Sequence, residues 1–201
     1  CAGGDLEGIV QEVTGDLGAE ALLDRFERID DLIERIAAFP APTVAVVDGP
    51  AYGAGGSLAL ACDVTIGSLA GSIGFGFHRL GLPPGAGASF FLSRRVGAST
   101  GLKLAITGES LNATTAAQLG LFDWVLDGAD IDRVLAEIVV QITSADRTVL
   151  AETKRLFRND RAQLVAAMRA ERKARNRVLE QSAHRESVLA FLEGSVTVFD
   201  E

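Results

Sequence analysis

The residues whose types and spacing best suit chemistry lie between positions 48 and 63, in the sequence Asp-Gly-Pro-Ala-Tyr-Gly-Ala-Gly-Gly-Ser-Leu-Ala-Leu-Ala-Cys-Asp. An apolar strand is predicted to enter this segment and an apolar helix to leave it. The glycines and other small residues between them allow the backbone to approach a ligand closely. A helix also begins with unpaired N–H groups and the positive end of its dipole. The sequence therefore predicts a turn that binds negative charge developing on an oxygen atom.

Other uses of a glycine-rich turn fit this spacing less well. A dinucleotide-binding fingerprint needs Gly-x-Gly-x-x-Gly, but Leu58 stands where the third glycine belongs. A phosphate-binding loop needs Lys followed by Ser or Thr after its last glycine, and this turn lacks the Lys-Ser/Thr pair. The segment Gly55-Gly-Ser57-Leu-Ala59 differs at one residue from the Gly-x-Ser-x-Gly pattern of a nucleophile elbow. That elbow follows its strand directly, whereas residues 49–54 intervene here, so a serine hydrolase using Ser57 is the less favoured alternative.

Length, charge and cysteine content exclude several classes of protein. The 201 residues are 48% hydrophobic, which is enough to bury a sizeable core. The net charge of −8 argues against binding to nucleic acid or to an anionic membrane, because such binders carry a basic face. Cys1 and Cys62 occur in unlike contexts, which argues against a disulfide framework and favours the cytoplasm. No signal peptide or membrane-spanning segment is predicted.

The elements that would position the turn can be predicted from hydrophobic periodicity. An amphipathic helix is indicated by apolar residues that recur every three or four positions, namely Leu22, Phe26, Ile29, Ile33 and Ile36. Helices are predicted over residues 22–36, 88–96, 100–107, 113–119, 130–143, 147–158, 161–181 and 188–193. Strands are predicted over residues 43–47, 64–67, 72–75 and 122–126, and a weakly patterned linker up to about Gly18. The first strand lacks alternation, which favours a strand covered on both faces.

Two turns, Ala-Gly-Gly-Asp at residues 2–5 and Gly-Pro-Ala-Tyr-Gly-Ala-Gly at residues 49–55, resemble those of the crotonase superfamily, the enoyl-CoA hydratase/isomerase family. The match continues in order at residues 59–63, 80–87, 95–97, 107–108, 116–121 and 190–194. It is closest to the isomerase and phenylacetate-degradation branch. The family's strands that normally precede the Ala-Gly-Gly-Asp turn are missing, so we expect an N-terminally truncated chain.

The resemblance implies an α/β fold, a spiral of ββα units over residues 1–128, followed by a helical oligomerisation region over residues 129–201. The partner copies would form a homotrimer or a hexamer. The ligand would be an acyl-CoA thioester, with coenzyme A as part of the substrate and no other cofactor or metal. The backbone N–H groups of Ala2 and Ala54 would form the oxyanion hole. Further substrate contacts are implied at Gly3, Gly4, Asp5, Leu6, Gly53, Gly55 and Phe77.

The sequence departs from the family where catalytic carboxylates usually stand. Ser57 and Phe77 replace the two glutamates of hydratases, and Gly85 replaces the acid of a subset of isomerases. Hydration needs a base for the water and an acid for the α-carbon. The pattern therefore favours isomerase-type double-bond chemistry in fatty-acid or aromatic-acid degradation. A lyase and a catalytically degenerate acyl-CoA-binding paralogue stay open as alternatives.

Several other residues have simpler interpretations. His78 is a weaker catalytic candidate, expected on a strand with its side chain pointing away from Phe77. We expect structural roles in capping or turn formation for Asp5 and Asp63, and a surface position for His184. The charged residues between positions 169 and 177 are interpreted as a solvated helix face.

Overall fold

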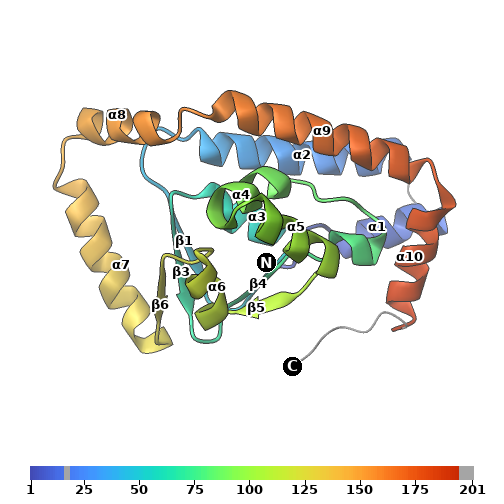
Figure 1. The fold of residues 1–201 in the computed structure, drawn as a ribbon, viewed down its shortest axis with the longest axis horizontal. Helices are drawn as coiled ribbons and strands as arrows, with labels where there is room; N and C mark the ends of the chain where they lie inside the picture. Colours follow the sequence, from blue (N-terminus) through green and yellow to red (C-terminus); the bar gives the residue numbers. More distant parts are fainter. Residues whose placement is uncertain (16–18, 195–201) are drawn as a thin grey trace.

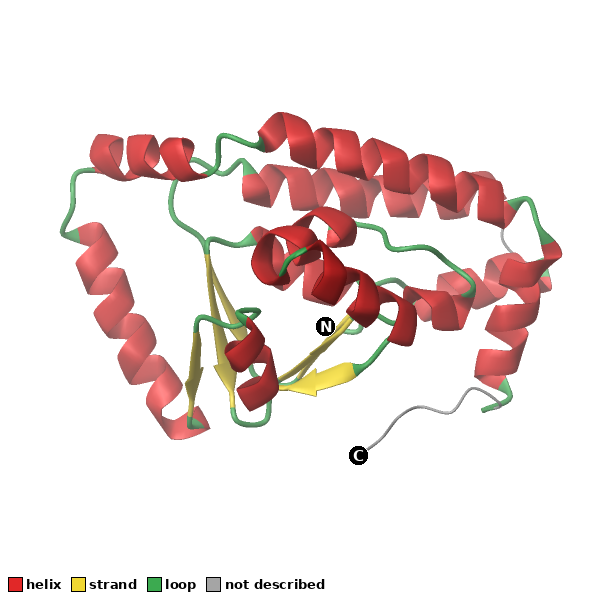
Figure 2. Cartoon of the chain, in the orientation of Figure 1, coloured by secondary structure: helices red, strands yellow, loops and turns green. Residues whose placement is uncertain are grey.

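A computed structural model describes residues 1–15 and 19–194 of the chain and contains two small sheets. The first sheet has the order β1-β3-β6 and is parallel throughout, with strands Val44–Val47, Val64–Ser68 and Trp124–Leu126. The second has the order β2-β4-β5, with strands Pro50–Tyr52, Ser72–Gly74 and Ser110–Asn112. In it β4 pairs with β2 in parallel and with β5 antiparallel. Figure 2 shows the strands meeting at an angle below the helices.

The chain visits the two sheets in turn and then forms a helix. Strands β1 and β2 are followed by helix α3 (Ala54–Ala61), and β3 and β4 are followed by the 3₁₀ helix η1 (Phe77–Leu80) and helix α4 (Ala88–Val96). Strand β5 is followed by α6 (Ala113–Leu119). Parallel neighbours need such crossovers, because a tight hairpin can join antiparallel strands only. The architecture is the predicted spiral of ββα units.

Helix α6 covers the predicted residues 113–119, and both of its ends are capped. Asn112 accepts a hydrogen bond from the backbone N–H of Thr115 at 2.9 Å, which satisfies one of the free donors of the first turn. Gly120 follows the helix with φ of 88°, a left-handed conformation that favours glycine. Helix α6 therefore begins and ends where its caps predict.

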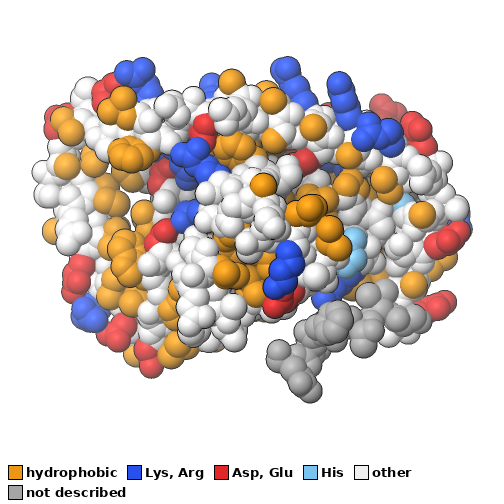
Figure 3. All heavy atoms as spheres, in the orientation of Figure 1, with side chains coloured by type: hydrophobic (Ala, Val, Ile, Leu, Met, Phe, Trp, Pro, Cys, Tyr) orange, Lys and Arg blue, Asp and Glu red, His pale blue; other side chains and the backbone are white. Residues whose placement is uncertain are grey.

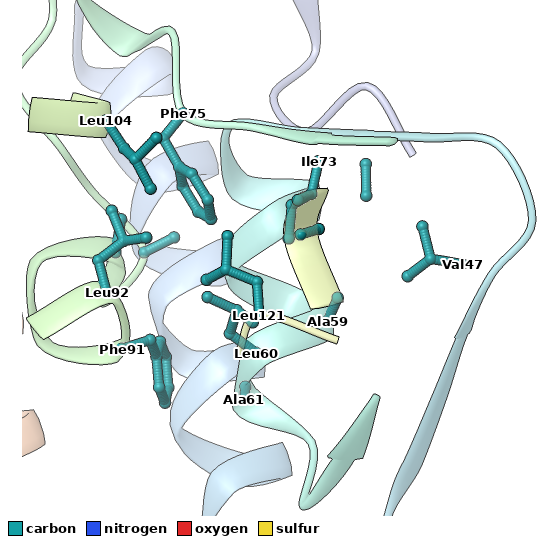
Figure 4. Packing of buried hydrophobic residues seen from close by; sticks show 14 of the residues in the cluster. Val47, Ala59, Leu60, Ala61, Ile73, Phe75, Phe91, Leu92, Leu104 and Leu121 are labelled. Carbon is teal, nitrogen blue, oxygen red and sulfur yellow. The ribbon is translucent and has the colours of Figure 1, made fainter. Parts of the chain in front are cut away.

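Helix α3 lies in the middle of the main hydrophobic core. Figure 4 shows Leu60 and Ala59 of this helix among Ile73, Phe75 and Leu121. Small residues are required on the helix, because a β-carbon on Gly56 would lie 3.0 Å from the Phe75 ring. The core therefore fixes the first turn of α3 against strand β2 and the β4–η1 connection.

The remaining helices are α1 (Leu6–Thr14), α2 (Ala19–Ala37), α5 (Ala98–Thr107), α7 (Gly128–Thr143), α8 (Arg147–Phe157), α9 (Arg161–Leu179) and α10 (Ser182–Leu192). Helices α2 and α9 run side by side over α3 and α4, whereas α7 and α8 extend away from the core (Figure 1). Figure 3 shows apolar side chains on the face that carries α7 and α8. Among the described helices none is long and apolar enough to cross a membrane.

Three predictions about the elements were wrong. Helix α1 occupies most of the expected linker, where Ile9 and Val13 are buried one helical turn apart, and residues 16–18 lie outside the described part. His78 belongs to the 3₁₀ helix η1 instead of a strand, between Gly76 and a left-handed Gly81. Strand β1 is an edge strand with Val46 38% exposed, so it is not covered on both faces. The short strands β2 and β5 were not predicted, because β2 lies inside the glycine-rich segment and β5 contains a single apolar residue, Leu111.

The charged helix α9 is only partly a solvated face. Glu171 and Arg175 are each 7% exposed, because they continue a buried stripe that begins with Leu164 and Met168. His184 is likewise buried rather than on the surface, and its Nδ1 lies 2.7 Å from the carbonyl oxygen of Leu80. The packing of α10 on η1 covers this histidine. The boundary between two domains at residue 128 stays a prediction.

Candidate active site

Two turns that are far apart in the sequence come together at the edge of the second sheet. The Cys1 carbonyl accepts a hydrogen bond from the N–H of Tyr52 at 2.9 Å, and the Cys1 amino group donates to Pro50 at 2.6 Å. Gly3 follows with φ of +88°, and a β-carbon on it would lie 2.4 Å from the Tyr52 carbonyl oxygen and 2.8 Å from the Ala54 nitrogen. Only glycine fits this close approach, so the Ala-Gly-Gly-Asp turn lies directly against the start of α3.

Ala54 is the first residue of α3 and has a backbone N–H without an intrahelical acceptor. Gly53 precedes it with φ of 57°, and no side chain caps the helix there. Ala2 and Ala54 both line the same cavity. The arrangement offers the N-terminus of a helix and a neighbouring backbone segment to a ligand oxygen in that cavity.

The cavity has a volume of about 340 Å³ and a mostly apolar lining. Of the residues predicted to form the site, those that line it are Ala2, Gly4, Leu6, Gly53, Ala54, Phe77 and Gly85. Gly3 and Gly55 instead pack backbone on backbone, since a β-carbon on Gly55 would lie 2.3 Å from the Cys1 carbonyl oxygen. These two glycines shape the cavity from behind its surface.

Phe77 stands between the oxyanion turn and the segment that follows η1. A β-carbon on Gly53 would lie 3.8 Å from Cε1 of Phe77, and one on Gly85 would lie 4.0 Å from the same atom. The aromatic ring is partly buried and lines the cavity. It therefore reduces the room for water between these two segments.

Ser57 lies in helix α3, three residues after Ala54. It is fully buried and does not line the cavity. Its hydroxyl donates to the Gly85 carbonyl oxygen at 3.4 Å. A serine nucleophile needs a base as its partner, and a backbone carbonyl cannot accept the proton. The contact instead joins α3 to the segment that carries Gly85.

Asp5 and Asp63 hold parts of the fold together. The Asp5 carboxylate pairs with Arg25 of α2, and its carbonyl accepts the Ile9 N–H of α1 at 3.1 Å. Asp63 accepts hydrogen bonds from the N–H and the hydroxyl of Thr43 at 2.8 and 2.9 Å. It also pairs with Lys154 at 2.6 Å, which ties α8 to the start of β1. Both carboxylates thus make structural contacts between separate elements, in place of the capping or turn formation that was expected from the sequence.

A buried charge pair in the cavity wall was not predicted from the sequence. Asp30 of α2 and Arg175 of α9 both line the cavity and are 2% and 7% exposed. Burial raises the pKa of Asp30, and the hydrogen bond from Arg172 opposes that rise. The sequence does indicate that Asp30 is buried, since it lies four residues after Phe26 and three before Ile33, on the apolar face of its helix.

Other polar groups line the cavity near β2 and β5. The Tyr52 hydroxyl lies 2.8 Å from the hydroxyl of Ser110, and both residues line the cavity. Arg79 also lines it and donates to the Gly108 carbonyl at 3.0 Å. His78, in contrast, is exposed and does not line the cavity. No cluster of metal-ligating side chains occurs in residues 1–15 and 19–194.

Comparison with known proteins agrees with this geometry. The family model described as enoyl-CoA hydratase/isomerase matches residues 1–201. The enoyl-CoA isomerase/hydratase fer4 of Mycosarcoma maydis is 31% identical over 99% of this chain and 72% of its own length. The 1,2-epoxyphenylacetyl-CoA isomerase of Escherichia coli is 34% identical over 71% of this chain and 52% of its own length.

Solved structures share the fold. A crystal structure of an enoyl-CoA hydratase from Mycobacterium avium subsp. paratuberculosis matches with a TM-score of 0.81 at 30% identity, over 89% of this chain and 73% of that one. An enoyl-CoA hydratase from Bacillus halodurans matches with a TM-score of 0.86 at 23% identity, over 92% of this chain and 74% of that one. The fold and the site thus define a crotonase-type protein. The chain belongs to the enoyl-CoA hydratase/isomerase family.

Proposed function

We propose that this protein binds an acyl-CoA thioester and stabilises its enolate between the backbone N–H groups of Ala2 and Ala54. The observation that carries the proposal is the close approach of the Gly3 backbone to the Ala54 nitrogen at the wall of the cavity. Gly4, Leu6 and Gly53 would contact the substrate beside them, and Asp5 and Gly55 would shape the turns. Coenzyme A would serve as part of the substrate, with no separate cofactor.

Backbone donors suit this task because they are already fixed by the fold. Negative charge develops on the thioester oxygen when a proton leaves the α-carbon, and two aligned N–H groups stabilise that charge. One donor of this kind is typically worth about 3 kcal/mol of transition-state stabilisation. The N-terminus of α3 adds the positive end of a helix dipole, and the apolar lining of the cavity strengthens both effects by excluding water.

The reaction that we propose is isomerisation of an enoyl-CoA double bond. A proton leaves the α-carbon of a 3-enoyl-CoA, its electron pair moves onto the thioester oxygen, and a proton returns at the γ-carbon to give the 2-enoyl-CoA. Hydration would need two positioned acid–base groups, but Ser57, Phe77 and Gly85 occupy the positions where the family carries its acids. The E. coli relative, named as a 1,2-epoxyphenylacetyl-CoA isomerase, supports the isomerase branch.

The assembly and location follow the family resemblance. We propose a homotrimer or hexamer in the cytoplasm, acting in fatty-acid or aromatic-acid degradation. The exposed apolar faces of α7 and α8 support contacts between copies. The missing carboxylates favour a second candidate function as well, an acyl-CoA-binding paralogue without turnover.

The test is to incubate the protein with 3-hexenoyl-CoA and crotonyl-CoA and to analyse the products by mass spectrometry and chromatography. Isomerisation leaves the mass of hexenoyl-CoA unchanged and moves its double bond, whereas hydration adds the mass of water to crotonyl-CoA. We expect the first reaction and little of the second. Robust hydration would contradict the proposed chemistry, and tight binding without either reaction would support the paralogue.

A further inference from the structure

The buried pair in the cavity wall has an uneven geometry. The Asp30 carboxylate is held by Arg172, whose Nε donates to Oδ2 at 2.9 Å. Nη1 of Arg175 lies 3.6 Å from the same oxygen, which is longer than a direct hydrogen bond. Arg172 therefore binds Asp30 from the solvent side, and Arg175 has only a loose ionic contact with it.

Arg175 has hydrogen-bonding capacity left over. Its side chain is 8% exposed, and its Nε has no hydrogen-bond partner among the described residues. A buried donor without an acceptor costs about 1–3 kcal/mol. The guanidinium carbon lies 4.6 Å from the centre of the Phe26 ring, so the group is held over an aromatic face in the cavity wall.

A purely structural role explains this arrangement poorly. An ion pair that joins α2 to α9 needs only Asp30 and Arg172, which already form the shorter contact. A buried ion pair as a whole is often no better for stability than well-packed apolar residues, because the desolvation of its charges offsets their attraction. Burial lowers the pKa of Arg175, which shows the direction of that cost. A guanidinium that is buried at this cost in a cavity wall is suited to contact with a ligand.

We propose that Arg175 recognises a carboxylate on the acyl group, so that the preferred substrates are CoA thioesters of dicarboxylic acids. This inference rests on the proposed function, because it places the acyl group in the same cavity. The guanidinium offers several donors in a planar fork that matches a carboxylate. The methylene chain between the thioester and that carboxylate would lie against other apolar side chains of the cavity lining, those of Ile29, Leu82 and Phe191.

Asp30 is the positioning residue for this contact. With Arg172 bound to its Oδ2, it holds a negative charge beside Arg175 without occupying the fork. An incoming carboxylate then completes the hydrogen bonding of Arg175. A plain alkyl chain would leave the Nε donor unsatisfied and would gain nothing from the charge.

The experiment is isothermal titration calorimetry of the full chain with hexanoyl-CoA, adipyl-CoA and the monomethyl ester of adipyl-CoA. We expect adipyl-CoA to bind about tenfold or more tightly than hexanoyl-CoA, as a charge-assisted hydrogen bond would provide. Arg175→Met should remove this preference, so that adipyl-CoA and hexanoyl-CoA bind the variant with similar affinities. Arg172→Met is the matched control, because it breaks the pair with Asp30 from the side that does not line the cavity.

Each result of the titrations supports or contradicts the role proposed for Arg175. Equal affinities, or tighter hexanoyl-CoA binding, would overturn the inference and leave the proposed function intact, whereas no binding of any CoA thioester would overturn the proposed function itself. Equal loss of the preference in both variants would show that the ion pair only joins the helices. If the monomethyl ester bound as well as adipyl-CoA, the recognised group would be a neutral oxygen and the assignment of a carboxylate would be wrong. The wild-type comparison stands even if a variant fails to fold.

Discussion

A β-carbon on Gly3 would lie 2.8 Å from the backbone nitrogen of Ala54, although helices α1 and α2 and strands β1 and β2 separate the two residues in the sequence. This contact presses the N-terminal turn against the first turn of α3. It also makes the position intolerant of any side chain, since Gly3 has φ of +88°. The proposed oxyanion hole depends on this approach.

Gly3→Ala should weaken acyl-CoA binding about tenfold or more, because the methyl group would push the two turns apart and a left-handed alanine is strained. Calorimetric titration with acetoacetyl-CoA would measure the loss. Gly128→Ala is the control, since a β-carbon there would meet no atom within 4 Å and the residue does not line the cavity. Equal effects of the two substitutions would contradict the role given to Gly3.

Ala54→Val should also weaken acyl-CoA binding while the fold survives, because the branched side chain would crowd the ligand at the first residue of α3. Ala98→Val places the same change at the exposed first residue of α5 and controls for the lower helix propensity of valine. Titration and thermal unfolding of both variants are the measurements. An unaltered affinity in Ala54→Val would show that the ligand lies elsewhere.

Gly85→Asp should raise the rate of 3-enoyl-CoA isomerisation, because it would place a carboxylate near the γ-carbon of the proposed substrate, at the position where a subset of the family's isomerases carries an acid. A positioned acid–base group contributes about a hundredfold to ten-thousandfold. The structure has room for the side chain, since the nearest atom to a β-carbon there is Cε1 of Phe77 at 4.0 Å. Gly85→Asn, which cannot transfer the proton, is the control, and equal rates in the two variants would count against the assignment.

Phe157→Asp should shift the protein toward the monomer. The side chain is 73% exposed at the end of α8, beside Leu156 at 68%, and an apolar pair of this kind suits burial between copies. Light scattering at micromolar concentration would show a trimer or hexamer for the wild type and smaller species for the variant. Leu69→Asp, at a similarly exposed position between β3 and β4, should leave the assembly unchanged. A monomeric wild-type chain would refute the prediction.

Glu171→Gln should destabilise the fold most at low pH. The carboxylate accepts hydrogen bonds from the N–H groups of Gly87 and Ser89 at 2.8 and 2.9 Å, and an amide cannot accept all of them, which costs about 1–3 kcal/mol. Burial raises the pKa of Glu171 above its ordinary value. The folded wild type therefore binds a proton more tightly than the unfolded chain, and it loses stability as the pH rises from the ordinary carboxyl pKa through the raised one.

Urea unfolding of both proteins across that pH range would measure the difference in the free energy of unfolding. The difference in the free energy of unfolding between wild type and variant should become smaller as the pH rises toward neutrality. An increase in that difference would mean that the folded state favours the charged carboxylate. Glu186→Gln, an exposed change on α10, controls for the loss of one negative charge.

Features that depend on local backbone chemistry and on periodicity could be predicted from the sequence. The glycine turn before α3 and the caps of α6 could be read because glycine and asparagine have conformational preferences that act within a few residues. The period of α2 fixed its buried face. The wall residues Phe77 and Gly85 could be placed by the order and spacing of the motifs along the chain.

Which distant groups share the cavity could not be predicted from the sequence, because it depends on how the helices pack. Arg175 meets Asp30 because α9 lies along α2, and neither helix carries a local signal for its partner. His184 is buried for the same reason, since α10 packs on η1. Such contacts depend on how the whole chain closes its core. The charged residues on the apolar faces of α2 and α9 were visible in the sequence. Their role could be inferred only from the cavity that the two helices line together.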